Sequence, residues 1–216
     1  SGTTDPDGTI AIGKSALTAL TSGARNVALG YYAGSETTIG IANIAIGFKA
    51  MLGDAGLQND SNIAIGSGHP TSSVLAAMGG QWTGVASTNN IAIGTGSMAG
   101  AMNNSTSNTC VGYKSGAGII GGDYNTAIGF SAGLGITSGG SNVILGAGAG
   151  AGISTMSECV LIGVDAGDAL STTSATDGTV AIGHTALGAL TTGAGNTAVG
   201  YLSGKSLTTA DYNTFV

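Results

Sequence analysis

A pentapeptide with the consensus Asn-x-Ala-Ile-Gly recurs along the whole 216-residue chain. Its closing glycines are, in order, Gly13, Gly30, Gly47, Gly66, Gly94, Gly112, Gly129, Gly146, Gly163, Gly183 and Gly200. Six of the ten intervals between them are 17 residues long, and the other four are 19, 28, 18 and 20 residues. A twelfth copy begins at Asn213. A period of this length indicates a repeat protein in which each unit stacks on its neighbours.

The middle of each pentapeptide has the composition of a β-strand. Its second residue is Ile, Val or Thr and its fourth is Ile, Val or Leu, and these residues favour strands. Because side chains alternate across a strand, Ile10 and Ile12 share one face while Ala11 and Gly13 share the other. We expect the aliphatic face to line the interior of each coil. The Ala/Gly face should then meet a neighbouring chain at close range, which predicts an oligomer.

Asparagine opens nine of the twelve copies, and Thr9, Cys159 and Thr179 open the other three. The nine are Asn26, Asn43, Asn62, Asn90, Asn108, Asn125, Asn142, Asn196 and Asn213. Asparagine tolerates a left-handed backbone and bonds to its own turn, so it suits a corner between strands. In a stack of parallel coils these amides could also form a hydrogen-bonded ladder along the axis.

The remainder of each unit is rich in Thr, Ser and Gly, which is typical of turns. An aromatic residue follows the glycine in five copies, at Tyr31, Phe48, Tyr113, Phe130 and Tyr201. We predict two short strands and two turns in each repeat. The whole chain is then an all-β protein, a parallel β-solenoid or β-roll of about eleven 17-residue coils. At about 4.8 Å per coil, it is roughly 50 Å long.

The repeat runs through residues 1–216 without a linker, which predicts one continuous domain with an inserted loop at 67–89. This loop contains the only tryptophan, Trp82, together with His69. Loops on repeat scaffolds often carry recognition, so His69 and Trp82 are candidate surface contacts for a glycan or a partner. The alternative is a decorative insertion in which Trp82 packs against its own coil.

Two observations predict that the chain is a fragment of a longer fibre. It starts at Ser1 rather than at methionine. Residues 7–34 also match residues 177–204 at 18 of 28 positions, an offset of ten 17-residue periods. A larger repeating unit would explain this match, and so would duplication of two adjacent coils.

Charge and hydropathy argue against several classes of protein. The net charge is −6 with only five basic residues, whereas nucleic-acid binding needs a basic surface. The most apolar run, at 143–153, is short and contains four glycines, whereas a membrane helix needs about 20 apolar residues. We therefore expect neither nucleic acid as a partner nor insertion into a membrane.

Chemistry-bearing residues are sparse and scattered. The two histidines, His69 and His184, have no second ligand at metal spacing. No two of the eleven acidic residues can be placed face to face as a glycosidase requires. Cys110 and Cys159 lie three coils apart, roughly 14 Å, which exceeds the reach of a disulfide. Cys110 should be a small buried hydrophobic residue. We expect no enzyme, no cofactor and no metal.

Two segments carry a resemblance to known proteins: Asn-Ile-Ala-Ile-Gly-Phe-Lys-Ala at 43–50 and Asn-Thr-Ala-Ile-Gly-Phe-Ser-Ala-Gly at 125–133. They resemble the repeats of phage tail-fibre shafts and of the heads of trimeric autotransporter adhesins. The resemblance covers nearly the whole chain and implies a homotrimer in a virion tail fibre or at the cell surface. The adhesin heads have a shorter period than 17 residues, which favours the fibre.

Two hypotheses of function follow. In the first, the chain is a structural shaft that extends a receptor-binding tip away from a particle. In the second, it is a surface adhesin that binds a host glycan or protein directly, through the shaft or the 67–89 loop.

Overall fold

The computed structural model describes residues 8–52, 56–68, 75–80, 82, 84–170 and 177–216. Within these ranges the protein contains strands and turns but no helix. The strands are β1 (Ile10–Ile12), β2 (Val27–Leu29), β3 (Ile44–Ile46), β4 (Ile63–Ile65), β5 (Ile91–Ile93), β6 (Thr109–Val111), β7 (Thr126–Ile128), β8 (Val143–Leu145), β9 (Val160–Ile162), β10 (Val180–Ile182), β11 (Thr197–Val199) and β12 (Thr214–Phe215). The predicted all-β solenoid of about eleven coils is confirmed.

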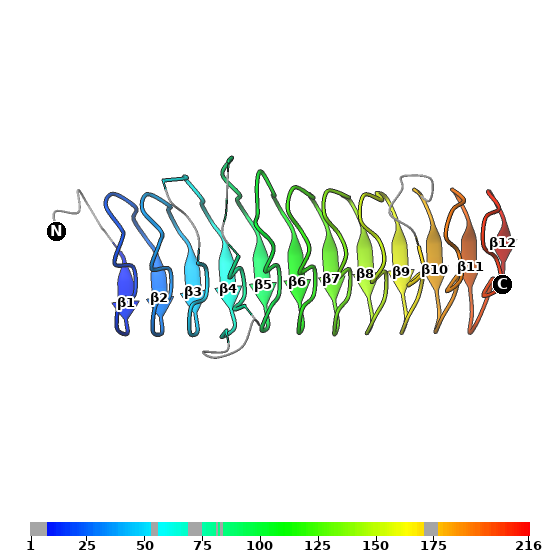
Figure 1. Ribbon diagram of the computed structural model, residues 1–216, viewed down its shortest axis with the longest axis horizontal. Helices are drawn as coiled ribbons and strands as arrows, with labels where there is room; N and C mark the ends of the chain where they lie inside the picture. Colours follow the sequence, from blue (N-terminus) through cyan, green and yellow to red (C-terminus); the bar gives the residue numbers. More distant parts are fainter. Residues whose placement is uncertain (1–7, 53–55, 69–74, 81, 83, 171–176) are drawn as a thin grey trace.

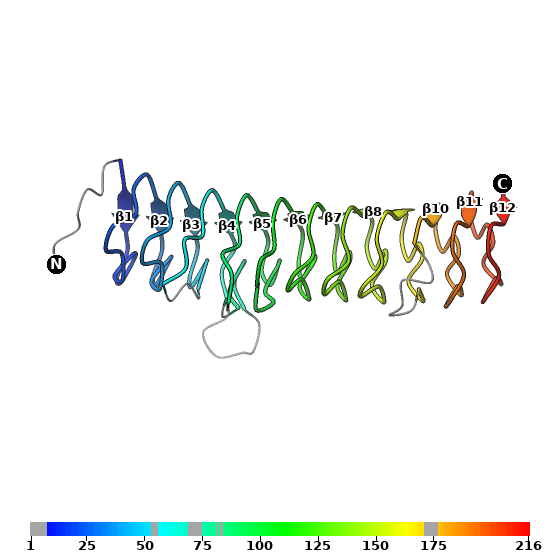
Figure 2. The ribbon, with the colours of Figure 1, turned by 90° about the horizontal axis from the view of Figure 1, so that it is seen from above.

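The twelve strands form one parallel sheet in which spatial order equals sequence order, β1 to β12. Equivalent residues pair at each step, as Ala28 does with Ala45 and Ala45 with Ala64. Figure 1 shows the strands in a single row, with the two ends of the chain at opposite ends of the stack. Seen from above in Figure 2, the sheet forms one wall of the solenoid and the turns lie on the other side. Each coil therefore contacts the coils next to it in sequence.

The second strand that we expected in each repeat is absent from the described residues, so this prediction is wrong. A series of tight turns follows each motif glycine, with bonds such as Ala33 N to Gly30 O (3.3 Å). Residues two and four positions after the glycine have left-handed backbone, as at Lys49 (φ 58°) and Met51 (φ 54°). A backbone that alternates in this way cannot form an extended strand. Bonds along the axis persist here, for example Gly34 N to Ala50 O (2.9 Å).

The core inside the coils is thin, and three positions of the repeat contribute to it: the central residue of the strand, the residue six positions later, and the residue nine positions later, such as Leu170. The first two of these positions vary in size. Where the strand residue is Ala45, the later residue is the large Met51, and both are buried. Where the strand residue is Leu161, the later residue is Gly167, and a Cβ built there would lie 3.0 Å from Leu161 Cδ2. In these two coils large and small residues compensate each other, as close packing requires, and Leu170 also lies against Gly167.

Candidate functional site

The outward face of the sheet is the largest surface that the repeat produces, and it has the opposite composition to our expectation. In ten strands, β2 to β11, the central residue is buried while both flanking residues are at least partly exposed. Ala92, for instance, is 0% exposed between Ile91 and Ile93. The prediction that the aliphatic residues line the coil is therefore wrong. The central residue, which is alanine in most strands, lies inside, and the two flanking residues lie outside.

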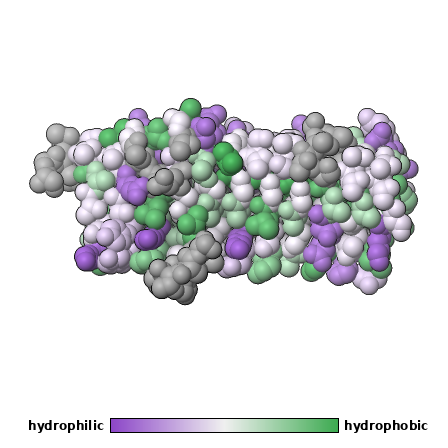
Figure 3. Space-filling view, viewed as in Figure 1, coloured by the Kyte–Doolittle hydropathy of each residue, from purple (hydrophilic) through white to green (hydrophobic). Residues whose placement is uncertain are grey.

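We call this surface the outer face: the first and third residues of β1 to β11, together with Thr214. These residues are Ile, Val, Leu or Thr, and none is charged. Ile93, Ile128 and Val199 remain 37%, 42% and 39% exposed. The outer face is thus a long apolar strip without charge. Figure 3 shows the opposite side of the molecule, that of the turns, where hydrophilic and hydrophobic residues are mixed.

The close approach that we expected at the Ala/Gly face occurs within the chain itself. Gly30 has φ 139°, and a Cβ built on it would lie 2.6 Å from the carbonyl oxygen of Gly47 in the next coil. Real Cβ atoms do not come so near to a backbone oxygen. The motif glycines therefore allow one coil to stack on the next, and they supply no argument for a neighbouring chain.

The motif asparagines form a buried amide ladder, as the sequence predicted. Oδ1 of Asn43 accepts hydrogen bonds from the backbone N (2.9 Å) and Nδ2 (3.3 Å) of Asn62. Nδ2 of Asn43 donates to Oδ1 of Asn26 (3.2 Å) and to the carbonyl of Asn59 (2.7 Å). The ladder joins Asn26, Asn43, Asn62, Asn90, Asn108, Asn125 and Asn142, and a second one joins Asn196 and Asn213. Cys159 and Thr179, whose side chains carry no amide, lie between the two ladders.

Four of the acidic residues have a structural role of the same kind. A carboxylate oxygen accepts a hydrogen bond from a backbone nitrogen one coil earlier. The pairs are Asp60 with Ile41 (2.7 Å), Asp123 with Thr106 (2.7 Å), Asp177 with Ser157 (2.8 Å) and Asp211 with Ala194 (2.8 Å). These acids hold adjacent coils together.

The residues after the motif glycines form a second exposed row, beside the outer face. Tyr31 stacks on Phe48 and Tyr113 stacks on Phe130, with ring centroids 5.6 and 5.4 Å apart. His184 stacks on Tyr201 at 5.4 Å. The sequence placed these residues in register but did not show that they pair. Equal register in adjacent coils was the signal that could have revealed the pairs.

Lysines accompany this row, and sequence reasoning missed them entirely. Nζ of Lys14 lies 5.6 Å from the ring centroid of Tyr31, and Nζ of Lys49 lies 5.5 Å from that of Phe48. Nζ of Lys114 lies 5.4 Å from the ring centroid of Tyr113. These distances are within the range of cation–π contacts.

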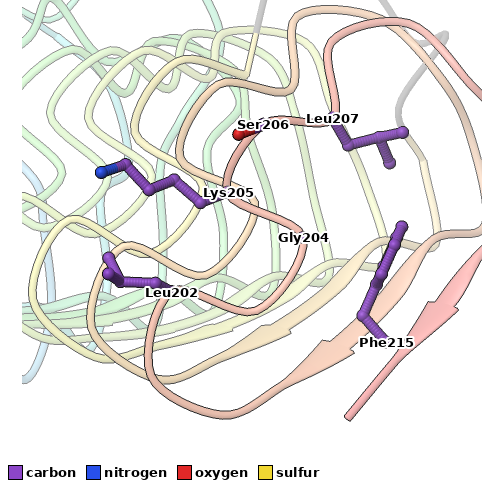
Figure 4. Close-up of a pocket in the computed structure, with 6 residues that line it drawn as sticks. All are labelled: Leu202, Gly204, Lys205, Ser206, Leu207 and Phe215. Atoms are coloured by element: carbon purple, nitrogen blue, oxygen red, sulfur yellow. The ribbon is translucent and has the colours of Figure 1, made fainter.

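The hollows in the described surface include two that are lined in part by a lysine. One, of about 500 Å³, lies at the C-terminal end of the stack and is lined by Leu202, Gly204, Lys205, Ser206, Leu207 and Phe215. Figure 4 shows Leu207 and Phe215 facing each other across it. In an inner coil the next coil covers this position, so the hollow is the open end of the core. The second hollow, of about 310 Å³, is lined by Tyr32, Ser35, Glu36, Lys49 and Leu52.

His69 and Trp82 are the two candidate surface contacts of the 67–89 segment. His69 lies outside the described residues. The side chain of Trp82 is only 5% exposed and belongs to the hydrophobic core, as do Ala77 and Met78. Trp82 was therefore wrong as a surface contact. Its segment contributes packing instead, since Met78 N donates to Ser97 O (2.9 Å) in the next coil.

The buried thiols and the acids do not converge on a reaction centre among the described residues. The thiols of Cys110 and Cys159 are buried, and burial raises their pKa values to about 12 and about 11. Burial also raises the pKa of Asp168, with a further contribution from Asp165. In the described ranges no three His, Cys, Asp or Glu side chains lie together as a metal site would require.

Comparison with known proteins gives no relative. No protein-family model, curated protein or solved structure matches the chain. Within the part of the chain that the structure describes, no helix is long and apolar enough to cross a membrane.

Proposed function

We propose that the chain is the shaft of an extracellular fibre, such as a phage tail fibre, that extends a receptor-binding tip away from a particle. The single-file parallel sheet carries this proposal, because every strand adds one step along one axis. Eleven strand spacings of about 4.8 Å give a rod of roughly 50 Å. The resemblance to tail-fibre repeats supports the same conclusion.

Resistance to bending and pulling would come from the bonds along the axis. Backbone bonds of the sheet, the asparagine ladder and the carboxylate bonds all run from coil to coil. The ladder is buried, where a hydrogen bond is stronger and an unpaired amide would cost more than in water. A rod held together in this way suits a mechanical role.

The shaft would associate with further copies of itself through the outer face. The outer face is three residues wide, at about 3.3 Å per residue, and roughly 50 Å long. Its area is therefore on the order of 500 Å², a size at which exposed apolar patches mark interaction sites. Its side chains repeat at the strand spacing, so a second sheet with the same spacing can interdigitate with it. A homotrimer of parallel shafts is the assembly that the resemblance implies.

Light scattering on the purified chain tests the association. We expect an oligomer that Ile93→Lys and Ile128→Lys, both on the outer face, convert to a monomer. Ile120→Lys is the matched control, because Ile120 is 44% exposed and lies outside the strands. A monomeric wild-type chain, or equal effects of all three variants, would overturn self-association through this face.

The shaft role itself needs a test on the intact particle or cell. Gold-labelled antibodies against residues 84–170 should mark the length of a filament between the surface and its tip. Label at the tip alone, or over a surface without filaments, would contradict the proposal. This outcome does not depend on the oligomeric state.

A further inference from the structure

The aromatic and lysine residues beside the outer face form a row with its own period. We call it the aromatic row, the residues that follow the motif glycines. In chain order they are Lys14, Tyr31, Phe48, Ser67, Thr95, Tyr113, Phe130, Ala147, Val164, His184 and Tyr201. Two ring-bearing residues alternate with two small or aliphatic ones, so ring pairs recur every four coils. At about 4.8 Å per coil, the pairs are roughly 19 Å apart.

The rings of each pair leave part of their faces uncovered. The Tyr113 and Phe130 planes are inclined by only 16°, but their centroids are 5.4 Å apart. Since stacked carbons touch at about 3.5–4 Å, the rings must be displaced sideways. Phe130 and Tyr201 are 59% and 75% exposed. Exposed ring faces of this kind suit the C–H face of a sugar ring, which is flat and apolar.

Positive charge is concentrated on this row. The chain has only five basic residues, and three of them, Lys14, Lys49 and Lys114, hold their ammonium groups near its rings. The chain as a whole has a net charge of −6. An ammonium group next to an apolar ring face suits a ligand that presents a carboxylate next to an apolar ring of its own.

Hydrogen-bonding groups lie beside the first ring pair. The hollow of about 310 Å³ is lined by Tyr32, Ser35, Glu36, Lys49 and Leu52. Tyr32 packs edge-on against Tyr31, with ring centroids 4.4 Å apart. Hydroxyl, carboxylate and ammonium groups around a small hollow are the partners that sugar hydroxyls use. The volume lies at the lower end of the range for small-molecule sites.

We infer that the aromatic row binds an acidic polysaccharide, one with carboxylates on repeated sugar units, along the axis of the solenoid. An extended sugar chain advances per unit by about the same distance as one coil, so successive units can follow the row. Contacts at several ring pairs on one polymer would add through effective concentration. The overall negative charge disfavours a densely charged polyanion such as nucleic acid. This binding is independent of the shaft role.

Titration calorimetry with polygalacturonate and polysialic acid tests the inference, with neutral dextran as the reference polymer. We expect binding of at least one acidic polymer and about tenfold weaker binding of the double variant Tyr113→Ala/Phe130→Ala. Lys114→Gln should weaken binding of the acidic polymer and leave the dextran result unchanged. These variants alter the second ring pair, Tyr113 and Phe130, because the structure describes the coils on both sides of it.

Matched controls keep the test specific to the row. Tyr212→Ala removes a tyrosine that is 81% exposed but follows a different corner of the coil, and Lys205→Gln removes a lysine outside the row. Both should bind as the wild type does. The inference is wrong if neither acidic polymer binds at millimolar concentration, if dextran binds equally well, or if the controls weaken binding as much as the row variants. Unchanged thermal midpoints would show that every variant is folded.

Discussion

Oδ1 of Asn108 accepts two hydrogen bonds from Asn125, one from its backbone nitrogen (2.9 Å) and one from its Nδ2 (3.0 Å). Asn125 in turn donates from Nδ2 to the carbonyl of Gly139 (2.9 Å) and accepts from Asn142. Both asparagines are 0% exposed. A single side chain thus joins three successive coils.

Asn125→Leu should destabilise the chain by roughly 3 kcal/mol or more, because it leaves buried partners on both sides unpaired. Urea denaturation followed by circular dichroism measures the loss. Asn89→Ser is the control, since Asn89 is exposed and serine occupies the equivalent position at Ser61 and Ser107. A loss below about 1 kcal/mol for Asn125→Leu would show that the ladder contributes little.

The shared core volume predicts a rescue. Leu161→Ala should cost about 2–5 kcal/mol through the cavity it leaves. Adding Gly167→Met returns volume to this part of the core, at a backbone angle close to that of Met51 (φ 59° against 54°), and requires only the flexible end of Leu170 to move. The double variant should therefore be more stable than Leu161→Ala alone. Thermal unfolding of Leu161→Ala, Gly167→Met and the double variant gives the coupling free energy between the two positions. If the two single losses simply add up to the loss of the double variant, the packing argument is contradicted.

Gly30 combines backbone strain with steric contact between coils, whereas Gly178 has backbone strain alone. Gly30→Ala places a Cβ against the carbonyl of Gly47, whereas a Cβ at Gly178 (φ 71°) meets nothing within 4 Å. Gly178→Ala should cost only about 1–2 kcal/mol of left-handed strain. Gly30→Ala should cost clearly more or prevent folding near β2. Equal losses in the unfolding free energy would mean that coils can move apart without cost.

Alkaline pH should destabilise the fold through Cys110. Burial raises the pKa of this thiol from 9.0 to about 12, so the folded state retains the proton while the unfolded state releases it. The contribution to stability is fully present below pH 9 and falls as the pH rises toward 12, with a slope of up to about 1.4 kcal/mol per pH unit. Cys110→Ala should have a flatter profile from pH 8 to 11. The unfolding free energy of the wild type and of Cys110→Ala is measured in urea at each pH. If the two change with pH in parallel, Cys110 is not the cause of the alkaline loss.

The repeat allowed the solenoid, its single domain axis and the asparagine ladder to be predicted, because one period fixes which residues lie side by side. It did not fix which strand face is inside. Both faces are apolar, so hydrophobicity alone favours neither. The path of the turns decides instead, and their left-handed residues, such as Lys49, give little sign in the sequence.

Trp82 and the row of lysines show a second limit. The sequence left two alternatives for Trp82, a surface contact or packing against its own coil, and its burial agrees with packing, since a large apolar ring gains most when it is buried. Lys14, Lys49 and Lys114 belong to two different positions of the repeat, so the register alone does not place them together. Only the paths of the turns bring their ammonium groups to the same row of rings.

The direction of the asparagine bonds gives the molecule a polarity. At every step of the ladder the later residue donates and the earlier one accepts, as Asn62 donates to Asn43 and Asn90 donates to Asn62. All the strands also point the same way across the axis. The two ends of such a stack are chemically different, one ending in donors and the other in acceptors. Any coil added in the same pattern must join head to tail, so a filament of these coils has a defined front and back.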